Sequence, residues 1–167
     1  MLAENYKIVP IYNEYDLSGH DTVMPSDSWN MKDYHHATIL LQYWTLGTAS
    51  PVAYVYSGAT AAALTTALTF HYAFAGADTG TAVAGSTASA DVLAAWATSA
   101  ALTVTHGTYT DSMLVIEVDA ADMDITNGYE WMTVNHTDPT SGLTGNVSGF
   151  AILKPRYKGN RIATCLA

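Results

Sequence analysis

Acidic residues between positions 117 and 124 are the first candidates for chemistry in this chain. Asp119, Asp122 and Asp124 follow Glu117 closely, and carboxylate oxygens are the ligands that calcium prefers in proteins. The spacing does not match the twelve-residue loop of an EF-hand, and a solvated turn accommodates carboxylates without a metal. We therefore expect no cofactor, with calcium held by Asp119, Asp122 and Asp124 as the alternative.

The histidines show no metal-binding spacing. His35 and His36 are adjacent, and neighbouring residues of a strand point to opposite faces, so this pair cannot hold one ion without a bulge. His71 lies among aromatic residues and is interpreted as a core histidine. The remaining histidines are predicted in turns or at strand ends: His20, His106 and His136.

No constellation for covalent catalysis is visible. The chain contains neither a Gly-x-Ser-x-Gly elbow nor a phosphate-binding Gly-x-x-x-x-Gly-Lys loop. The single cysteine, Cys165, excludes an internal disulfide. Its position near the C-terminus predicts a free thiol at a mobile end. We expect no catalytic residue and no enzymatic activity.

Aromatic side chains offer a binding surface instead of a catalyst. Tyr129 and Trp131 are two residues apart and are predicted on the outward face of one strand. Such residues form a sugar-stacking platform, a contact between subunits, or a packing surface beneath a loop, and packing beneath a loop explains them best. The tryptophans available for a platform are Trp29, Trp44, Trp96 and Trp131.

Residues 112–139 are interpreted as a strand, an acidic turn and a second strand, paired as a hairpin. Leu114, Ile116 and Val118 alternate with outward residues, which is typical of a strand with one buried face. Asn127-Gly128 is a reversal signal, because both residues tolerate positive φ. Met132 and Val134 then alternate in the same way and are predicted to lie in the core.

Short strands separated by turn residues indicate an all-β fold. We predict a single antiparallel β-sandwich of the jelly-roll kind over residues 34–157, preceded by an extended N-terminal arm (1–33) and followed by a short basic tail (158–167). Pro10 lacks the N–H of a ladder donor and favours an edge strand or an isolated strand. Residues 60–67 are predicted as a short helix, and residues 75–90 as a loop. The predicted strands are residues 34–43, 51–56, 68–74, 101–105, 112–119, 129–137 and 146–153.

Charge is distributed unevenly along the chain. All fifteen acidic residues lie before Lys154, where only two lysines oppose them, so residues 1–153 carry a net charge of −13. Such a body argues against nucleic-acid binding, because phosphate contacts need a basic surface. No run is apolar enough for a membrane helix and no leader is visible, so we expect synthesis in the cytoplasm. The basic residues after position 153 are Lys154, Arg156, Lys158 and Arg161.

Five segments carry a resemblance to known proteins. They are KIVPIYN (7–13), MKDYHHATILLQ (31–42), MLVIEVDAADMDITNGYEWMTV (113–134), AILKPRYKGN (151–160) and the terminal TCLA. With these segments the chain resembles virion structural proteins of tailed bacteriophages, small β-sandwich proteins of the capsid-decoration or minor capsid kind. Residues 59–105 carry no part of the resemblance.

The resemblance implies a structural role on the virus particle. The protein is expected to bind the outer lattice of the capsid, with the major capsid protein and copies of itself (a trimer, for example) as partners. Its place would be the capsid surface, after synthesis in the host cytoplasm. The alternatives are a tail or connector component, and a carbohydrate-binding β-sandwich assisted by calcium.

Subunit contacts are expected from the arm, the aromatic face and the tail. Deleting residues 1–33 or residues 158–167 is expected to abolish attachment to the particle while leaving the fold intact. The residues expected to make these contacts are Tyr6, Ile8, Ile11, Tyr129, Trp131, Lys154, Arg156, Lys158 and Arg161.

Overall fold

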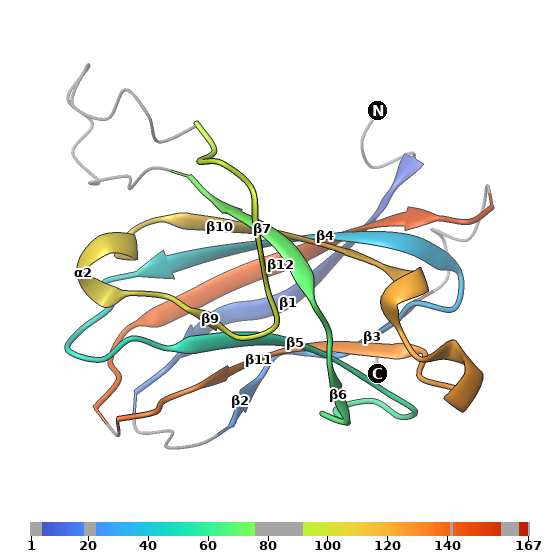
Figure 1. The fold of residues 1–167 in the computed structure, drawn as a ribbon, viewed down its shortest axis with the longest axis horizontal. Helices are drawn as coiled ribbons and strands as arrows, with labels where there is room; N and C mark the ends of the chain where they lie inside the picture. Colours follow the sequence, from blue (N-terminus) through green and yellow to red (C-terminus); the bar gives the residue numbers. More distant parts are fainter. Residues whose placement is uncertain (1–4, 19–22, 76–91, 141, 158–163, 167) are drawn as a thin grey trace.

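Two six-stranded antiparallel sheets form the upper and lower layers of the molecule (Figure 1). The computed structural model describes residues 5–18, 23–75, 92–140, 142–157 and 164–166. Sheet A contains, in spatial order, β1 (Lys7–Asp16), β12 (Asn146–Pro155), β4 (Tyr34–Trp44), β10 (Met113–Asp119), β7 (Phe70–Phe74) and β8 (Ala97–Ser99). Sheet B contains β2 (Met24–Pro25), β11 (Trp131–Thr137), β5 (Val52–Gly58) and β6 (Thr66–Ala67), with β3 (Trp29–Asn30) on β11 and β9 (Leu102–Thr103) on β5.

The strand order is that of a jelly roll. Sheet A places β1, β12, β4 and β10 side by side, and sheet B faces it with β2, β11, β5 and β6. The chain therefore crosses repeatedly from one sheet to the other, as in the double Greek key of this architecture. The predicted all-β sandwich is confirmed, and the strands predicted from alternation correspond to β4, β5, β7, β9, β10, β11 and β12.

The predicted hairpin over residues 112–139 is wrong. Strand β10 lies between β4 and β7 in sheet A, whereas β11 lies in sheet B. Two 3-10 turns connect them, η1 (Ala120–Asp122) and η2 (Ile125–Asn127). Gly128 ends η2 in the left-handed region, with φ of 73° and its N–H bonded to the Ile125 carbonyl. Asn127-Gly128 thus marks the end of a helical turn, which tolerates positive φ as well as a hairpin does.

The N-terminal segment is extended, as predicted, but it is not separate from the sandwich. Strand β1 pairs with β12 from Lys7 to Asp16 and forms the edge of sheet A, the position that Pro10 favours. Ile11 and Trp29 are 3% and 0% exposed. Residues 1–33 therefore contribute strands and core side chains to the domain.

The C-terminus also packs on the sandwich. Cys165 is buried, and its carbonyl accepts a hydrogen bond from the N–H of Asn30 at 2.8 Å. Leu166 forms a β-bridge with Trp29. Burial raises the pKa of the Cys165 thiol, so the mobile thiol that was expected is instead a buried, protonated one.

The predicted helix over residues 60–67 is wrong, and the predicted loop over residues 75–90 is not tested. Residues 60–67 do not form the predicted helix, because they make a turn that leads into β6. A short α-helix, α2 (His106–Tyr109), lies before β10 instead. The loop predicted over residues 75–90 falls outside the described residues, apart from Ala75.

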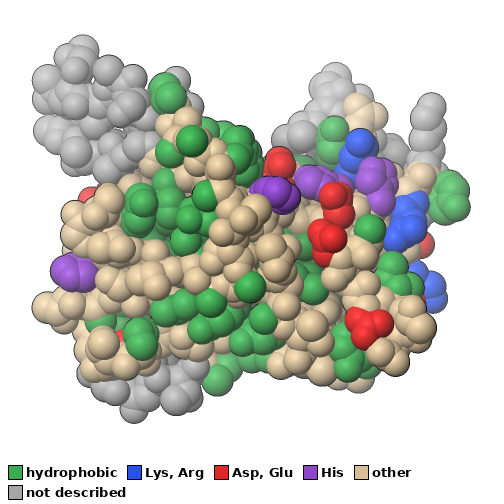
Figure 2. Space-filling view, viewed as in Figure 1, with side chains coloured by type: hydrophobic (Ala, Val, Ile, Leu, Met, Phe, Trp, Pro, Cys, Tyr) green, Lys and Arg blue, Asp and Glu red, His purple; other side chains and the backbone are tan. Residues whose placement is uncertain are grey.

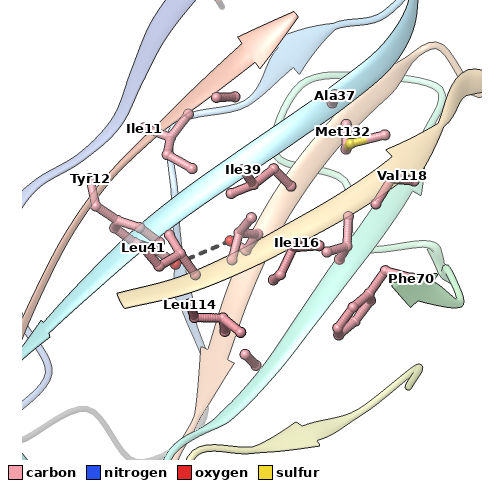
Figure 3. Close-up of a cluster of buried hydrophobic side chains, with 14 of the residues drawn as sticks. Ile11, Tyr12, Ala37, Ile39, Leu41, Phe70, Leu114, Ile116, Val118 and Met132 are labelled. Atoms are coloured by element: carbon pink, nitrogen blue, oxygen red, sulfur yellow. Dashed lines mark hydrogen bonds between the residues drawn. The ribbon is translucent and has the colours of Figure 1, made fainter. Parts of the chain in front are cut away.

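The core lies between the two sheets, as the alternation predicted. Leu114, Ile116, Val118, Met132 and Val134 are each at most 2% exposed. Figure 3 shows several of them converging with side chains from neighbouring strands. Burying one such side chain contributes about 1.5–3 kcal/mol, so this cluster supplies the main stabilisation of the fold.

A polar network crosses this core and joins the two sheets. His136 of β11 is fully buried and lies between two tyrosines of sheet A. Its Nδ1 is 3.0 Å from the Tyr12 hydroxyl, and its Nε2 is 2.8 Å from the Tyr43 hydroxyl. Tyr12 also donates to the Met24 carbonyl at 2.7 Å.

These contacts assign the protons of the network. Burial lowers the pKa of His136 to about 3, so the imidazole is neutral at pH 7. Because the Tyr12 hydroxyl donates its proton to Met24, it accepts the Nδ1–H of His136. Nε2 is then unprotonated and accepts from Tyr43. Every proton has one acceptor, which a buried network requires to be stabilising.

We expect deletion of residues 1–33 to prevent folding, because it removes β1 and the buried side chains of Ile11 and Trp29. Deletion of residues 164–167 should lower the melting temperature but leave the sandwich folded. Circular dichroism and size-exclusion chromatography of the two truncations would test this. A compact, cooperatively melting protein lacking residues 1–33 would contradict the assignment of β1 to the domain.

We expect stability to fall with acidification because unfolding releases His136 to its ordinary pKa of 6.5, against about 3 in the fold. The unfolded state then binds more protons between these values, so stability is full above pH 6.5 and declines below it. The loss should be about 2 kcal/mol at pH 5 and about 4 kcal/mol at pH 3. Urea unfolding at pH 7, 5 and 4 measures it.

The His136→Gln variant should be less stable at pH 7 but lose most of this slope. His71→Gln is the matched control, since His71 is exposed, and it should retain the slope. Equal unfolding free energies of the parent protein at pH 7 and pH 5 would be incompatible with a buried neutral His136.

Candidate functional site

The outer face of sheet A carries a row of apolar side chains across four strands. Pro10 of β1 lies opposite Phe150 of β12, Phe150 opposite Leu40 of β4, and Leu40 opposite Val115 of β10. Phe150 is 44% exposed, Pro10 is exposed and Leu40 is half-buried, whereas Val115 is only 6% exposed, so the exposed part of the row lies on β1, β12 and β4. The adjacent rows add Ile8, Ile152 and Met113 to this surface, which we call the outer apolar face.

A groove of about 710 Å³ runs across the outer apolar face, from β1 over β12 and β4 to β10. Two backbone features shape it. The register of β1 shifts between Pro10 and Tyr12, and both Ile11 and Tyr12 are buried there. Gly149 lies opposite Tyr12, and a Cβ at this position would come within 2.6 Å of Leu41 and 2.8 Å of the Leu40 carbonyl. Only glycine allows the strands to approach this closely.

One carboxylate lines the groove, and others lie on the strands that border it. Asp27 lines it beside β1, and Glu14 is exposed on the same strand. On β10, Glu117 and Asp119 point outward. The Oδ1 of Asp119 lies 2.8 Å from the Nδ1 of His36, and the two atoms form a hydrogen bond. In Figure 2 acidic, basic and histidine side chains gather in the right half of the molecule, whereas uncharged side chains cover most of the left half.

The structure divides the predicted contact residues between two regions. Ile8 and Lys154 are exposed on the outer side of sheet A. Ile11 is 3% exposed in the core, so its side chain is not offered to a partner. Tyr6 is half-buried just before β1. Tyr129, Trp131 and Arg156 line pockets near the η1–η2 connection; Lys158 and Arg161 lie outside the described residues.

The acidic turn does not gather its carboxylates around one point. Asp119 bonds to His36, and Asp124 caps η2 by accepting from the backbone N–H and the Nδ2 of Asn127 at 3.3 and 2.6 Å. Asp122 is exposed. Within the described ranges, no three His, Cys, Asp or Glu side chains are placed to hold a metal ion.

The histidine that matters most was assigned to a strand end by sequence. His136 follows Met132 and Val134 at two-residue intervals, and this spacing places all three on the buried face of β11. This spacing is enough to predict that His136 is buried. It does not predict which residues form hydrogen bonds with the imidazole. His71, interpreted as a core residue, is exposed instead.

The four tryptophans do not form a common platform. Trp29 is fully buried, whereas Trp44 and Trp96 are 50% and 46% exposed on β4 and before β8. Trp131 is half-buried at the start of β11.

Asp138, which follows β11, is a buried acidic residue. Burial raises the pKa of its carboxyl group, but hydrogen bonds from Thr140, Gly142 and Leu143 outweigh this effect and hold that pKa below its ordinary value.

Comparison with protein-family models, with curated proteins and with solved structures finds no match to this chain. Among the residues that the structure describes, no helix is long and apolar enough to cross a membrane.

We expect calcium to leave the melting temperature unchanged, because Asp119 and Asp124 are already engaged with His36 and Asn127. Differential scanning calorimetry in calcium and in chelator measures this. A rise in melting temperature that disappears in Asp122→Asn would instead identify a metal site at the turn.

Proposed function

We propose that this protein is a non-enzymatic structural component of a tailed-bacteriophage virion, a decoration protein that binds the outer lattice of the capsid. The observation that carries the proposal is the outer apolar face of sheet A. The resemblance of the terminal segments and the β10–β11 region to virion proteins supports the same role. A position in the tail or connector is the second candidate within the virion.

Apolar side chains on the outer face of sheet A favour binding to another protein. In an antiparallel sheet that packs on a core, the second face is usually polar and solvated. Here Phe150, Leu40 and Pro10 stand in one row on that second face. A contiguous exposed patch of this kind is typical of protein-binding surfaces, and its central aromatic residue is the type that contributes most to binding.

The charge around the face indicates the chemistry of the partner. Asp27 lines the groove, and Glu14 and Glu117 lie on the bordering strands β1 and β10. Lys154 is a basic side chain on this side of the sheet, and residues 1–153 as a whole carry a net charge of −13. A protein surface with an apolar centre and a basic rim is complementary to it. On a capsid, the major capsid protein would supply that surface, and symmetry would present it repeatedly, so copies can also gather as trimers at local axes.

We expect Phe150→Ser to weaken attachment to empty capsids at least about tenfold, because an aromatic anchor at the centre of an interface is removed. Co-sedimentation of purified protein with empty capsids measures the affinity. The fold should be retained, since the Phe150 side chain points away from the core.

Ile125→Ser is the matched control for this experiment. Ile125 is 52% exposed on η2, away from the outer apolar face, and its replacement should leave attachment unchanged. Equal attachment of Phe150→Ser and the parent protein would exclude this face as the docking surface, and no attachment of the parent to any capsid would exclude the proposed role.

A further inference from the structure

A second concave region lies where η1 and η2 carry the chain from sheet A to sheet B. Two adjoining pockets of about 350 and about 160 Å³ are found there, and Lys32 and Glu130 line both. The combined size falls within the range of ligand sites, about 300–1,000 Å³. This region shares no lining residue with the groove on sheet A.

The larger pocket pairs an aromatic ring with hydrogen-bonding side chains. Trp131 lines it together with Asn30, Asp33 and Glu130. The C-terminal segment closes one side through the hydrogen bond between the Asn30 N–H and the Cys165 carbonyl. The Asn30 side-chain oxygen accepts from the backbone N–H of Lys32 at 2.8 Å, which fixes the orientation of its amide.

The smaller pocket also combines an aromatic ring with side chains that can form hydrogen bonds. Tyr129 lines it beside Met31, Met123 and Arg156. The Nε of Arg156 donates to the Tyr34 carbonyl at 3.0 Å, and the Tyr129 N–H donates to the Asp124 carbonyl at 3.1 Å. The Arg156 backbone N–H also donates to the Asp33 carbonyl at 2.8 Å, so the backbone of both residues is hydrogen-bonded in place.

Charges in the two pockets balance. Lys32 and Arg156 are basic, and Asp33 and Glu130 are acidic. A balanced site gives no net attraction for a polyanion or a polycation. An apolar ring with carboxylate and amide groups around it suits a neutral ligand that has both an apolar face and many hydroxyl groups.

We propose that this region binds a neutral oligosaccharide, with one sugar ring against Trp131 and a neighbouring unit against Tyr129. The C–H face of a pyranose is apolar and packs on the face of an aromatic ring. Its hydroxyl groups donate to Asp33 and Glu130 and accept from Asn30 and Lys32. The proposal is independent of the capsid-binding role, since the two surfaces share no residue.

Titration calorimetry with neutral chito-, malto- and cello-oligosaccharides tests the proposal on the full chain. We expect saturable binding of at least one series, and a loss of at least about tenfold in Trp131→Ala, equivalent to about 1.4 kcal/mol. Trp44→Ala is the matched control, because Trp44 is exposed at the end of β4, and its affinity should equal that of the parent.

Glu130→Gln provides a second variant if Trp131→Ala fails to fold, and it should also weaken binding. Absence of saturable binding in all three series, or unchanged affinity in both variants, would overturn the proposal. Binding of a sulfated oligosaccharide or an extended peptide in place of the neutral sugars would overturn it as well.

Discussion

The buried hydrogen-bond network around His136 is the constraint on which the arrangement of the two sheets depends. A neutral imidazole in the core needs both a donor and an acceptor partner, since leaving either nitrogen unpaired costs about 1–3 kcal/mol. Tyr12 and Tyr43 supply them from β1 and β4, and His136 supplies the link from β11. The network therefore fixes where β1 lies over sheet B. Tyr12 can reach His136 only because the bulge in β1 turns two consecutive side chains inward.

The same bulge shapes the surface that we assign to binding. Where Ile11 and Tyr12 both enter the core, the outward positions of β1 are interrupted, and the groove opens beside Phe150. Gly149 allows the close approach of β12 and β4 at this point. The packing of Ile11 and Tyr12 in the core and the groove of the proposed docking surface thus arise from the same bulge in β1. One apolar face of sheet A is covered by sheet B, and we propose that a partner covers part of the other.

Part of this arrangement was predictable from single residues, and part was not. Alternation identified β10 and β11 and their buried residues, because side-chain direction along a strand is a local property. The hairpin failed because Asn127-Gly128 records only that positive φ is tolerated, which both a turn and the end of η2 require. The N-terminal segment is predicted as an arm because Pro10 and the turn-rich residues after it give no sign of a strand partner, whereas in the structure β1 pairs with β12, more than a hundred residues away in the chain. Of the residues lining the proposed sugar-binding pockets, the sequence singles out Trp131 but not Asn30 or Glu130, since nothing in their spacing shows that they meet.

The sequence by itself determined most of the longer strands and their buried faces, that Pro10 suits an edge position, and that the body is acidic, but not the short strands β2, β3, β6 and β8. The tertiary structure alone decided that β10 and β11 belong to different sheets, that His136 meets two tyrosines, and that Phe150 joins Leu40 in one row. The physical reason is the range of the forces involved. Periodicity reports the environment of a side chain but not the identity of its neighbour, whereas strand order follows from the burial and hydrogen bonding of the whole chain at once.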